Sequence, residues 1–550
     1  MNSQTNIEQP PQTSIKETLT SVIIAFALAF VFRGFVIEAF VIPTGSMAPT
    51  LMGAHMRFRD PANGYAWQVN PWDYTNASLQ VPKAVQGQPP DRPISVTNPM
   101  TKEQLKLSSV EKLAGDRIFV LKYLYSIFDP QRWDVVVFKN PRDPAENYIK
   151  RLVGLPNEQI ALIDGDLFTR PIAPETATDP TDKNTWAASG WTIQRKPEMV
   201  QRSVWQPVYN SDFPPKGDGF RSPWLPKGTG WQTDVRKPMS FAGAGTAELE
   251  WDSGRWPITD RYAYNETPAF RPLRTDNAAT GGLPTSLAQE IYPVGDVRVA
   301  LAMTPTEKPV TTGFTMRARR HEFRAQLSPE SGKAVVSVRP EGDAAAAWKE
   351  IGQGDLPSGA LAAGRATNVE FWFVDQSVQV FVEGSRVVNA PFDWTPSQRV
   401  EASFGAPLDQ MLARESGESI FSDPRVYGRA EFGLSFAGGG FTLHRVQVDR
   451  DLFYQPTQRR GMAAAAGSHP YVPKFLGPDH FFTCGDNSPA SDDCRSWYTI
   501  DPWVARQIDP TIGVVPRDLL IGKAFFVYFP SAKNRFGLPV PDFGRMRFIF

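Results

Sequence analysis

The stretch Val-Ile-Pro-Thr-Gly-Ser-Met-Ala-Pro-Thr-Leu at residues 41–51 directly follows the one long apolar run of the sequence. Pro43 and Pro49 each lack a backbone N–H donor and fix φ, so the stretch cannot lie inside a helix. Gly45 lets the backbone approach a ligand closely or adopt a positive φ. One interpretation is a plain turn beside a membrane, since these residue types are common in turns. The sharper interpretation is a nucleophilic serine, Ser46, held at a membrane surface, with its partner groups elsewhere in the chain.

The apolar run that precedes this stretch covers residues 19–37 and is interrupted near its end by Arg33. A helix of about 19 residues, at about 1.5 Å per residue, is long enough to cross a bilayer, and Arg33 can reach the headgroups. A cleaved signal peptide is the alternative, but a basic leading region and an A-x-A site are not evident. We therefore predict a disordered tail over residues 1–14 and a single-pass signal anchor over residues 15–37. The charges do not fix its orientation, because Lys16 is the only basic residue before the apolar run.

Composition narrows the class of protein. The 550 residues include 58 basic and 58 acidic side chains, so nucleic-acid binding is not indicated. With 50 prolines and 42 glycines between short runs of Val, Phe, Tyr and Trp, the sequence predicts a mainly β protein of two or three domains. Two cysteines are too few for a cysteine-based zinc site, and the five histidines form no ligand motif. We predict no metal and no cofactor.

A polar insert at residues 58–112 contains two knuckle-like turns, 60–65 and 98–101, that lack cysteines. Strand patterns resume after it, and strands are expected at residues 115–122, 132–138 and 148–156. Residues 160–168 predict a hairpin whose turn is the Asp-Gly pair at 164–165.

A long insert follows. Residues 171–290 are irregular and rich in Trp, Pro and Gly, whereas residues 291–450 alternate repeatedly between apolar and polar side chains, most clearly over 369–384. Short strands at this spacing predict a β-sandwich. The strand–turn–strand ending in Val-Glu-Gly at 382–384 resembles laminin-G or concanavalin-like lectin sandwiches. Because fold does not fix function, carbohydrate and a protein partner both stay open as ligands of the insert. We expect residues 451–480 to be a linker.

Four motifs occur in the order found in bacterial type I signal peptidases, and together they resemble that family of membrane-bound Ser-Lys enzymes, which cut signal peptides from exported preproteins. The motifs are Pro-Thr-Gly-Ser-Met-Ala-Pro-Thr-Leu at 43–51, Arg-Trp-Asp-Val-Val-Val-Phe at 132–138, Tyr-Ile-Lys-Arg-Leu-Val-Gly-Leu-Pro at 148–156 and Gly-Asp-Asn-Ser-Pro-Ala-Ser-Asp-Asp-Cys-Arg at 485–495. The resemblance implies a β catalytic core in three parts, at residues 38–57, 113–170 and 481–550. It also implies a place in the cytoplasmic (inner) membrane, with the catalytic domain on the extracytoplasmic side.

By this resemblance Ser46 is the nucleophile and Lys150 the general base. A serine hydroxyl needs an adjacent base to attack a carbonyl. Lysine can be that base only when neutral, so burial must lower its pKa. An exposed strand lysine is the plain alternative. The neighbours that could supply an apolar wall are Tyr148, Ile149, Leu152 and Val153.

The resemblance assigns further roles. The Ser46 backbone N–H and the Thr44 hydroxyl would form the oxyanion hole. Ser491 would hold the lysine amine, and an Asp493–Arg495 ion pair would brace the loop. Gly-Asp-Asn-Ser-Pro at 485–489 is also a common turn sequence, and the Asp493–Arg495 pair could serve only to hold the fold, so a purely structural role stays open.

Signal peptides end in a small-x-small pattern, which implies shallow apolar pockets beside an extended peptide. The positions expected to line them are Phe40, Ile42, Met47, Leu51 and Ile149. Core or lipid contacts are the alternative for these side chains. The implied partners are signal peptides of secreted preproteins and membrane lipid.

Cys484 lies directly before the last motif and Cys494 lies within it, at a position where the family commonly has serine. In an oxidising compartment they could form a disulfide that closes the loop. Their spacing does not establish that their Cα atoms are close enough.

Two competing functions remain. The chain could be a membrane-tethered binding protein that uses the 291–450 sandwich and keeps a relic peptidase core. It could also be a penicillin-binding or β-lactamase-like enzyme, because Ser-Val-Glu-Lys at 109–112 fits S-x-x-K. That string lies in a polar stretch without the supporting motifs, so we discount it.

Overall fold

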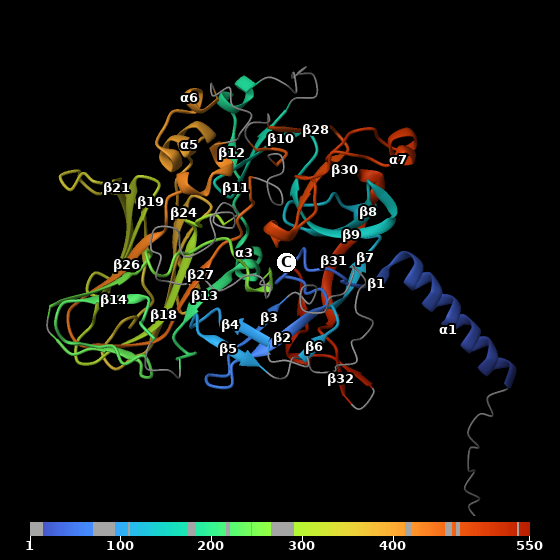
Figure 1. Cartoon of the computed structure of the whole chain (residues 1–550). Helices are drawn as coiled ribbons and strands as arrows, with labels where there is room; N and C mark the ends of the chain where they lie inside the picture. Colours follow the sequence, from blue (N-terminus) through green and yellow to red (C-terminus); the bar gives the residue numbers. More distant parts are fainter. Residues whose placement is uncertain are drawn as a thin grey trace, which may run out of the picture.

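The computed structural model is mainly β, as predicted, and places a β-sandwich beside a second β-rich body that bears the N-terminal helix (Figure 1). It describes residues 15–69, 94–107, 111–172, 183–215, 220–243, 245–265, 291–412, 420–456, 465–468, 473–535 and 538–550. The predicted tail at 1–14 and the serine of the S-x-x-K string lie outside these residues.

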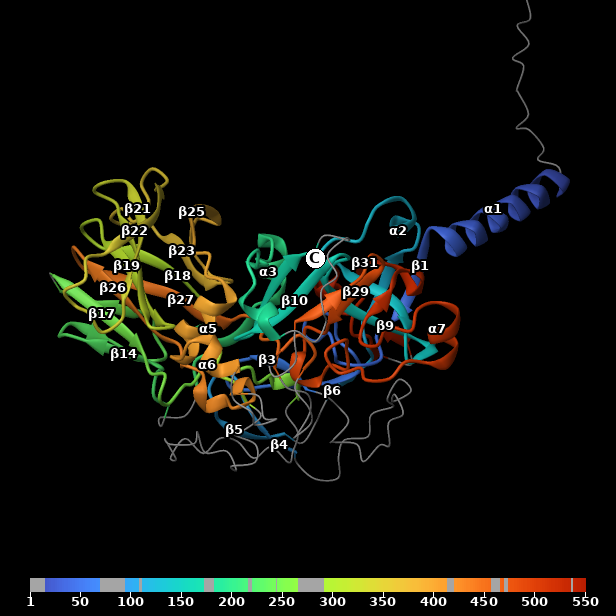
Figure 2. The ribbon, with the colours of Figure 1, turned by 90° about the horizontal axis from the view of Figure 1, so that it is seen from above.

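An eight-stranded antiparallel sheet contains strands from all three predicted core segments and brings together segments from both ends of the chain. Its order is β1 (Ile37–Val41), β7 (Arg117–Leu121), β31 (Leu520–Phe529), β8 (Val135–Asn140), β9 (Asp143–Gly154), β29 (His480–Cys484) and β30 (Val515–Pro516), with β34 (Arg547–Phe548) paired to β31. Residues that are hundreds of positions apart in sequence therefore become strand neighbours, as the mixed blue, cyan and red ribbons of this body show (Figure 2).

The strands predicted from the core motifs are confirmed. β7 alternates between half-buried and buried side chains, as its sequence Arg-Ile-Phe-Val-Leu requires. β9 begins at Asp143, earlier than predicted, because a tight connection after Asn140 pairs it with β8. The hairpin of β10 (Glu158–Ile163) and β11 (Asp166–Pro171) is also confirmed. Asp164 and Gly165 both have positive φ, 50° and 83°, as a type I′ turn needs.

β10 and β11 belong to a four-stranded sheet that also contains residues from the far side of the insert. Its order is β12 (Thr192–Ile193), β11, β10 and β28 (Lys474–Leu476). β28 falls in the predicted 451–480 linker, and Leu452, Phe453 and Tyr454 of the same stretch are buried. The described residues of 451–480 are therefore packed against the folded protein, and the prediction of a linker is wrong for them.

The insert forms a sandwich of two antiparallel sheets. One has the order β15 (Trp231–Gln232), β16 (Met239–Phe241), β27 (Phe441–Arg450), β18 (Val297–Pro305), β23 (Thr367–Val374), β24 (Ser377–Val382) and β25 (Ser385–Pro391), with β13 (Gln206–Asn210) paired to β27. The other has the order β14 (Trp224–Lys227), β17 (Thr246–Trp251), β26 (Glu431–Ala437), β19 (Thr311–Ala318), β20 (His321–Ser328), β21 (Lys333–Pro340) and β22 (Lys349–Asp355). Residues of both sheets share one apolar core, in which Phe314 and Phe371 stack with centroids 5.3 Å apart.

The sandwich starts earlier than predicted. Its first strand begins at Gln206, and strands between there and Trp251 complete both sheets, whereas the sequence assigned residues 171–290 to an irregular region. These strands are short and several lie at sheet edges, so their pairing depends on tertiary contacts. Only β17 among them alternates clearly, in Thr-Ala-Glu-Leu-Glu-Trp. The clearest predicted stretch, 369–384, is confirmed as the β23–β24 hairpin.

The insert at 58–112 packs with the residues just before it in a small separate core, formed by Met56, Phe58, Trp67, Val69 and Val96. Its described strands are β2 (His55–Arg59), β3 (Ala66–Val69) and β6 (Glu111–Leu113) in one sheet, and β4 (Ile94–Thr97) and β5 (Gln104–Leu107) in another. The two knuckle-like turns meet, because the Asn98 amide donates to Asp60 Oδ2 at 2.6 Å. A direct hydrogen bond therefore joins these turns.

Short helices cover the strands: α2 (Leu124–Ile127), α3 (Glu198–Val204), α5 (Pro396–Phe404), α6 (Leu408–Leu412) and α7 (Pro502–Gln507). Residues 533–540 form a hairpin of β32 (Lys533–Arg535) and β33 (Leu538–Val540).

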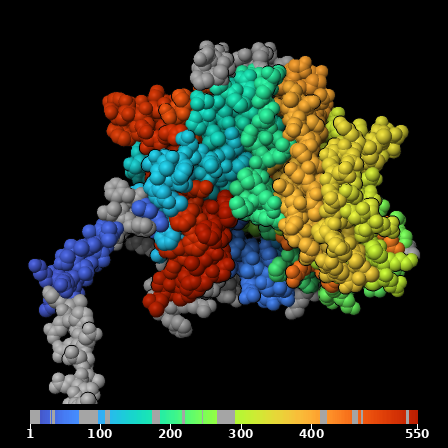
Figure 3. Space-filling model, turned by 180° about the vertical axis from the view of Figure 1, so that it is seen from behind, coloured from blue at the N-terminus to red at the C-terminus, as the bar shows by residue number. Residues whose placement is uncertain are grey.

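The predicted anchor forms helix α1 (Ile15–Phe35), which stands away from the rest of the protein (Figure 3). The helix ends before the predicted limit, because Ile37 already pairs with Leu121 as the first residue of β1. Within the part of the chain that is described, no helix combines the length and apolarity needed to span a membrane.

Candidate active site

Ser46 lies in the loop that connects β1 to β2. Its neighbour Met47 is buried in the core beneath the sheet together with Leu51 and Ile42. The Ser46 carbonyl accepts a hydrogen bond from the Asn487 backbone N–H at 3.0 Å. The loop is therefore held both by apolar packing from below and by the C-terminal part of the core.

Lys150 reaches this serine from β9. It pairs with Val136 on β8, and its side chain is only 4% exposed. The Lys150 Nζ donates to Ser46 Oγ at 2.6 Å, across 104 positions of sequence. The Tyr148 ring lies beside the amine, with its centroid 5.1 Å from Nζ. The exposed-lysine alternative is therefore wrong for this residue.

Burial changes the acidity of this amine. Desolvation lowers the pKa of Lys150 to about 8, and the carboxylates of Asp493 and Asp492 oppose that shift only in part. A neutral amine near neutral pH can accept a proton from a hydroxyl, which an ordinary lysine cannot.

The third core segment closes over the pair. Asp493 and Arg495 form a buried bidentate ion pair, with Nη2 to Oδ2 at 2.8 Å and Nε to Oδ1 at 2.9 Å, as predicted. Gly485 packs so tightly here that a Cβ atom would lie 2.5 Å from the Ser46 carbonyl oxygen. The Gly485 N–H also donates to Asp493 Oδ2 at 2.9 Å. The ion pair therefore fixes the strand end that packs against the Ser46 backbone.

Ser491 does not hold the lysine amine as predicted, since no hydrogen bond joins Ser491 to Lys150 in the described residues. Its hydroxyl is buried and makes no hydrogen bond among the described residues, but it lies near enough to Asp493 to influence that carboxyl. Burial alone would raise the pKa of Asp493, but Arg495 and then Ser491 outweigh it and hold that pKa below its usual value.

The oxyanion hole stays a prediction. Thr44 is exposed, and among the described residues neither its hydroxyl nor the Ser46 backbone N–H makes a hydrogen bond. Both donors are thus unused within the described chain.

The five pocket positions divide into two groups. Phe40 and Ile149 are half-buried at the edge of the core cluster. Ile42, Met47 and Leu51 are 3%, 0% and 0% exposed, so they pack the core and do not line an open pocket in this structure. The prediction is wrong for these three because a loop that carries a fixed nucleophile needs its own apolar anchor.

The disulfide that the sequence left open is not formed in this structure. Cys484 and Cys494 are both free and buried, and Cys494 Sγ accepts a hydrogen bond from the Thr483 backbone N–H at 3.2 Å. Burial raises the pKa of the Cys494 thiol to about 12, so it stays protonated.

Two sets of residues near the site escaped the sequence analysis. One is a fully buried ion pair between Arg151, next to the lysine, and Asp486, with Nη2 to Oδ2 at 2.7 Å. The other is a segment of the insert, Tyr262, Tyr264 and Asn265. It touches residues 42–54 between β1 and β2, which we call the nucleophile loop because they include the predicted nucleophile, and it also bonds to Asn487. The first lay inside the quoted motifs, whereas nothing in the sequence pointed to the second.

One group of carboxylates could hold a cation. Asp166, Asp296, Asp375 and Asp451 lie within 4.8 Å of one another between the sandwich and the four-stranded sheet. The Lys196 ammonium already lies 2.6 Å from Asp375 and 2.8 Å from Asp451. A protein cation therefore occupies this position.

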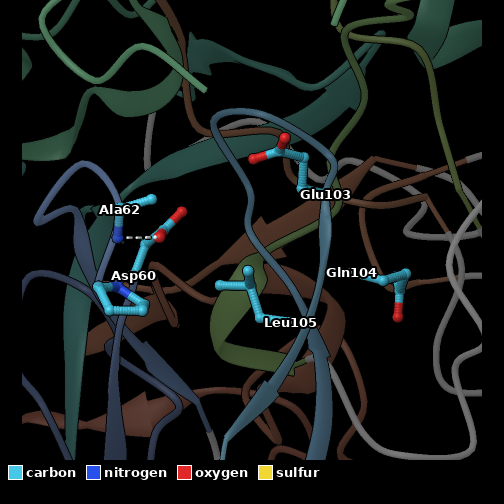
Figure 4. A pocket seen from close by; sticks show the side chains of 6 residues that line it. Asp60, Ala62, Glu103, Gln104 and Leu105 are labelled. Carbon is cyan, nitrogen blue, oxygen red and sulfur yellow. Dashed lines mark hydrogen bonds between the residues drawn. The ribbon is translucent and has the colours of Figure 1, made fainter. Parts of the chain in front are cut away.

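A cavity of about 410 Å³ lies at the 58–112 insert, where Ala62 N–H donates to Asp60 Oδ1 at 2.8 Å (Figure 4). Its lining residues are Asp60, Pro61, Ala62, Glu103, Gln104 and Leu105. These include no predicted site residue.

A serine hydroxyl and a buried lysine amine in one hydrogen bond have the geometry that a serine hydrolase with a lysine base requires. Residues 102–203, which include Lys150, match the family model of signal peptidase, peptidase S26. The signal peptidase I of Rickettsia prowazekii (strain Madrid E) is 27% identical over 156 residues, covering 28% of this chain and 43% of that protein. That of Rickettsia bellii (strain OSU 85-389) is 27% identical over 165 residues, covering 30% of this chain and 43% of that protein.

The chain is thus a relative of type I signal peptidases that carries a large β-rich insert, and the predicted family is confirmed. It spans less than half the length of these relatives. Among solved structures, a carbohydrate-binding module CBM66 from Bacillus subtilis covers 42% of this chain and 96% of its own, at 8% identity and a TM-score of 0.23. A galectin-like protein of unknown function from Bacillus subtilis covers 44% and 96%, at 10% identity and a TM-score of 0.24.

Proposed function

We propose that this protein is a membrane-bound serine endopeptidase that removes signal peptides from exported preproteins, with Ser46 as nucleophile and Lys150 as general base. The observation that carries the proposal is the 2.6 Å hydrogen bond between the Lys150 Nζ and Ser46 Oγ, made by a buried amine. The similarity to signal peptidases I supports the substrate class.

The proposed reaction begins when neutral Lys150 takes the Ser46 proton as Oγ bonds to the scissile carbonyl carbon. The oxyanion receives hydrogen bonds from the Ser46 N–H and the Thr44 hydroxyl. The lysine ammonium then protonates the departing amine of the mature protein as the C–N bond breaks. In the second half, Lys150 deprotonates a water that hydrolyses the Ser46 ester and releases the signal peptide.

The sheet offers an edge for the substrate. β29 pairs with β9 only over Arg151–Gly154, so among the described strands the preceding part of β9 is open on that side. An extended peptide could add there and place its cleavage site beside Lys150. Half-buried Ile149 and Phe40 would then bound the shallow pocket for the small residue.

We further propose that α1 anchors the protein at the cytoplasmic membrane, with the catalytic body on the extracytoplasmic side. The helix exposes a set of large apolar side chains, Ile15, Leu19, Val22, Ile23, Ile24, Phe26, Leu28 and Phe30. Such a surface is unfavourable in water and favourable in lipid.

The direct test is cleavage of a purified preprotein in detergent. We expect a single cut after the small residue that ends the signal peptide, identified by the N-terminal sequence of the product. A preprotein with tryptophan in place of that small residue should stay intact as the matched control. If the wild-type protein leaves the first substrate uncut, the proposal is wrong.

The pH dependence tests the role of the lysine. Because only the neutral amine is active and the pKa of Lys150 is about 8, kcat/KM should rise roughly tenfold from pH 7 to pH 9 and then level off. Asp492 favours the ammonium from an exposed position, so Asp492→Asn should move this rise to lower pH. A flat profile, or a shift to higher pH in the variant, would contradict a lysine base.

A further inference from the structure

A short piece of the insert, residues 260–265, lies directly on the nucleophile loop; we call it the insert strap. Its two tyrosines, Tyr262 and Tyr264, are buried in one cluster with Ala48 and Met52 of that loop. The strap ends in the short 3₁₀ helix η3 (Ala263–Asn265). More than two hundred positions of sequence separate these partners, so the contact depends on how the insert folds.

Tyr264 fits against the loop backbone. Its hydroxyl donates to the Ala54 carbonyl at 3.2 Å. Its ring covers Gly45, and a Cβ atom built on Gly45 would lie 2.0 Å from a ring carbon. The backbone of Gly45 is not in the left-handed region, so the glycine is needed here for space alone.

Asn265 links the strap to Ser46 through a second asparagine, Asn487. Its side-chain amide exchanges two hydrogen bonds with that of Asn487, at 2.7 and 2.8 Å. Asn487 in turn donates from its side chain to the Gly45 carbonyl at 2.9 Å and from its backbone to the Ser46 carbonyl at 3.0 Å. A chain of hydrogen bonds thus runs from the insert to the two residues that set the position of Oγ.

The other end of the strap is fixed to the sandwich side. The Asp260 carboxylate accepts from the Tyr292 backbone N–H at 2.8 Å, and its carbonyl accepts from Arg450, the last residue of β27, at 3.1 Å. The Arg450 guanidinium also lies over the Tyr262 ring at 4.3 Å. The strap is therefore tied at both ends.

We propose that the insert strap positions the nucleophile, so that cleavage by this enzyme depends on its large insert. Tyr264 and Asn265 are positioning residues: they hold Gly45 and the Ser46 carbonyl so that Oγ stays within reach of Lys150. The inference rests on the function proposed above and adds a role for residues outside the peptidase motifs. A misplacement of about 1 Å at a reacting group can lower a rate by about 100-fold.

A size exchange between Gly45 and Tyr264 tests the proposal. Gly45→Ala should lower kcat by about 100-fold with little change in KM, because the added methyl group displaces the loop against the ring. Tyr264→Ala should recover at least tenfold of that loss in the double variant, since it vacates the space. Tyr264→Phe keeps the ring and should recover nothing.

Asn265→Ala and Asn487→Ala form a second, milder test. Each should lower kcat, and the double variant should lose no more than Asn487→Ala alone, because both act through one hydrogen-bonded chain. Tyr427→Phe removes a buried hydroxyl that donates to a backbone carbonyl within the insert, at 2.8 Å, and should leave kcat unchanged.

The outcomes separate the two proposals. If the wild type cleaves and neither the size exchange nor the asparagine pair behaves as expected, the strap inference is wrong and the proposed function stands. If kcat falls only in step with a lower melting temperature, the strap is merely structural and the inference is also wrong. If the wild type does not cleave, both proposals fail.

Discussion

Replacing Lys150 with methionine is expected to abolish preprotein cleavage and to stabilise the folded protein. The variant lacks the proton acceptor for Ser46, which should lower kcat by roughly 10²- to 10⁴-fold. It also removes an amine that burial penalises when charged, because folding lowers the pKa of Lys150 from its usual value to about 8. Methionine fills similar space without that penalty, so the free energy of unfolding should rise by up to about 3 kcal/mol at pH 7.

The change of this stability gain with pH tests whether the charged amine of Lys150 is its cause. A lysine whose pKa is lowered by folding destabilises the folded state below pH 8, and this loss fades as the pH rises from about 8 toward the usual lysine value. The stability gain of Lys150→Met should therefore be largest at neutral pH and shrink in alkaline buffer, which denaturation by urea at several pH values can measure.

Lys139→Met is the matched control, because Lys139 is an exposed lysine on β8 of the same sheet. It should change neither cleavage nor stability appreciably. Ser46→Ala should match Lys150→Met in lost activity. Substantial cleavage by Lys150→Met, or a marked loss of its stability at pH 7, would contradict the assignment.

The proximity of Ser46 and Lys150, the proposed catalytic pair, could be predicted because short motifs contain both residues. Ser46 lies in a proline-flanked stretch that cannot be helical, and Lys150 lies in the motif Tyr-Ile-Lys-Arg-Leu-Val-Gly-Leu-Pro of the expected strand at 148–156. The turn at Asp164 and Gly165 was predictable for the same reason, since local chemistry fixes its φ values. These features depend on residues that are neighbours in the chain.

Other features depend on tertiary contacts, and the sequence did not show them. The short strands from Gln206 onward are stable only because longer strands pair with them. The family motif places Met47 at a pocket position, and only the three-dimensional structure shows that the core beneath the sheet buries it. Tyr264 and Asn265 lie in an irregular region without periodicity, and their contact with the nucleophile loop appears only in three dimensions.

The buried amine of Lys150, which destabilises the fold when charged, lies next to a fully buried ion pair between Arg151 and Asp486. Arg151 follows Lys150 and is fully buried, where its guanidinium donates twice to Asp486 and also to the Trp133 carbonyl at 2.8 Å. Asp486 in turn accepts from the Thr50 hydroxyl at 2.5 Å. One buried carboxylate thus ties β9, the nucleophile loop and the last core segment together, directly beside the catalytic pair.

Asp486→Ala should therefore be the most destabilising of the substitutions considered, lowering the free energy of unfolding by about 3 to 5 kcal/mol. The reason is that Arg151 would keep its charge at a fully buried position without the carboxylate that pairs with it. Asp355→Ala is the matched control, because it breaks an ion pair of similar length, 2.7 Å, with Lys333 at an exposed site. That change should alter stability by less than about 1 kcal/mol.

Urea denaturation of Asp486→Ala and Asp355→Ala measures the two losses of stability. A double variant that replaces both Arg151 and Asp486 gives a further test. Arg151→Met combined with Asp486→Ala removes the stranded charge, so the double variant should be more stable than Asp486→Ala alone. Cleavage should stay low in the double variant, because the loop that carries Ser46 would still lack the hydrogen bond from Thr50 to its anchor. Equal losses in Asp486→Ala and Asp355→Ala would mean that the buried pair does not hold the three core segments together.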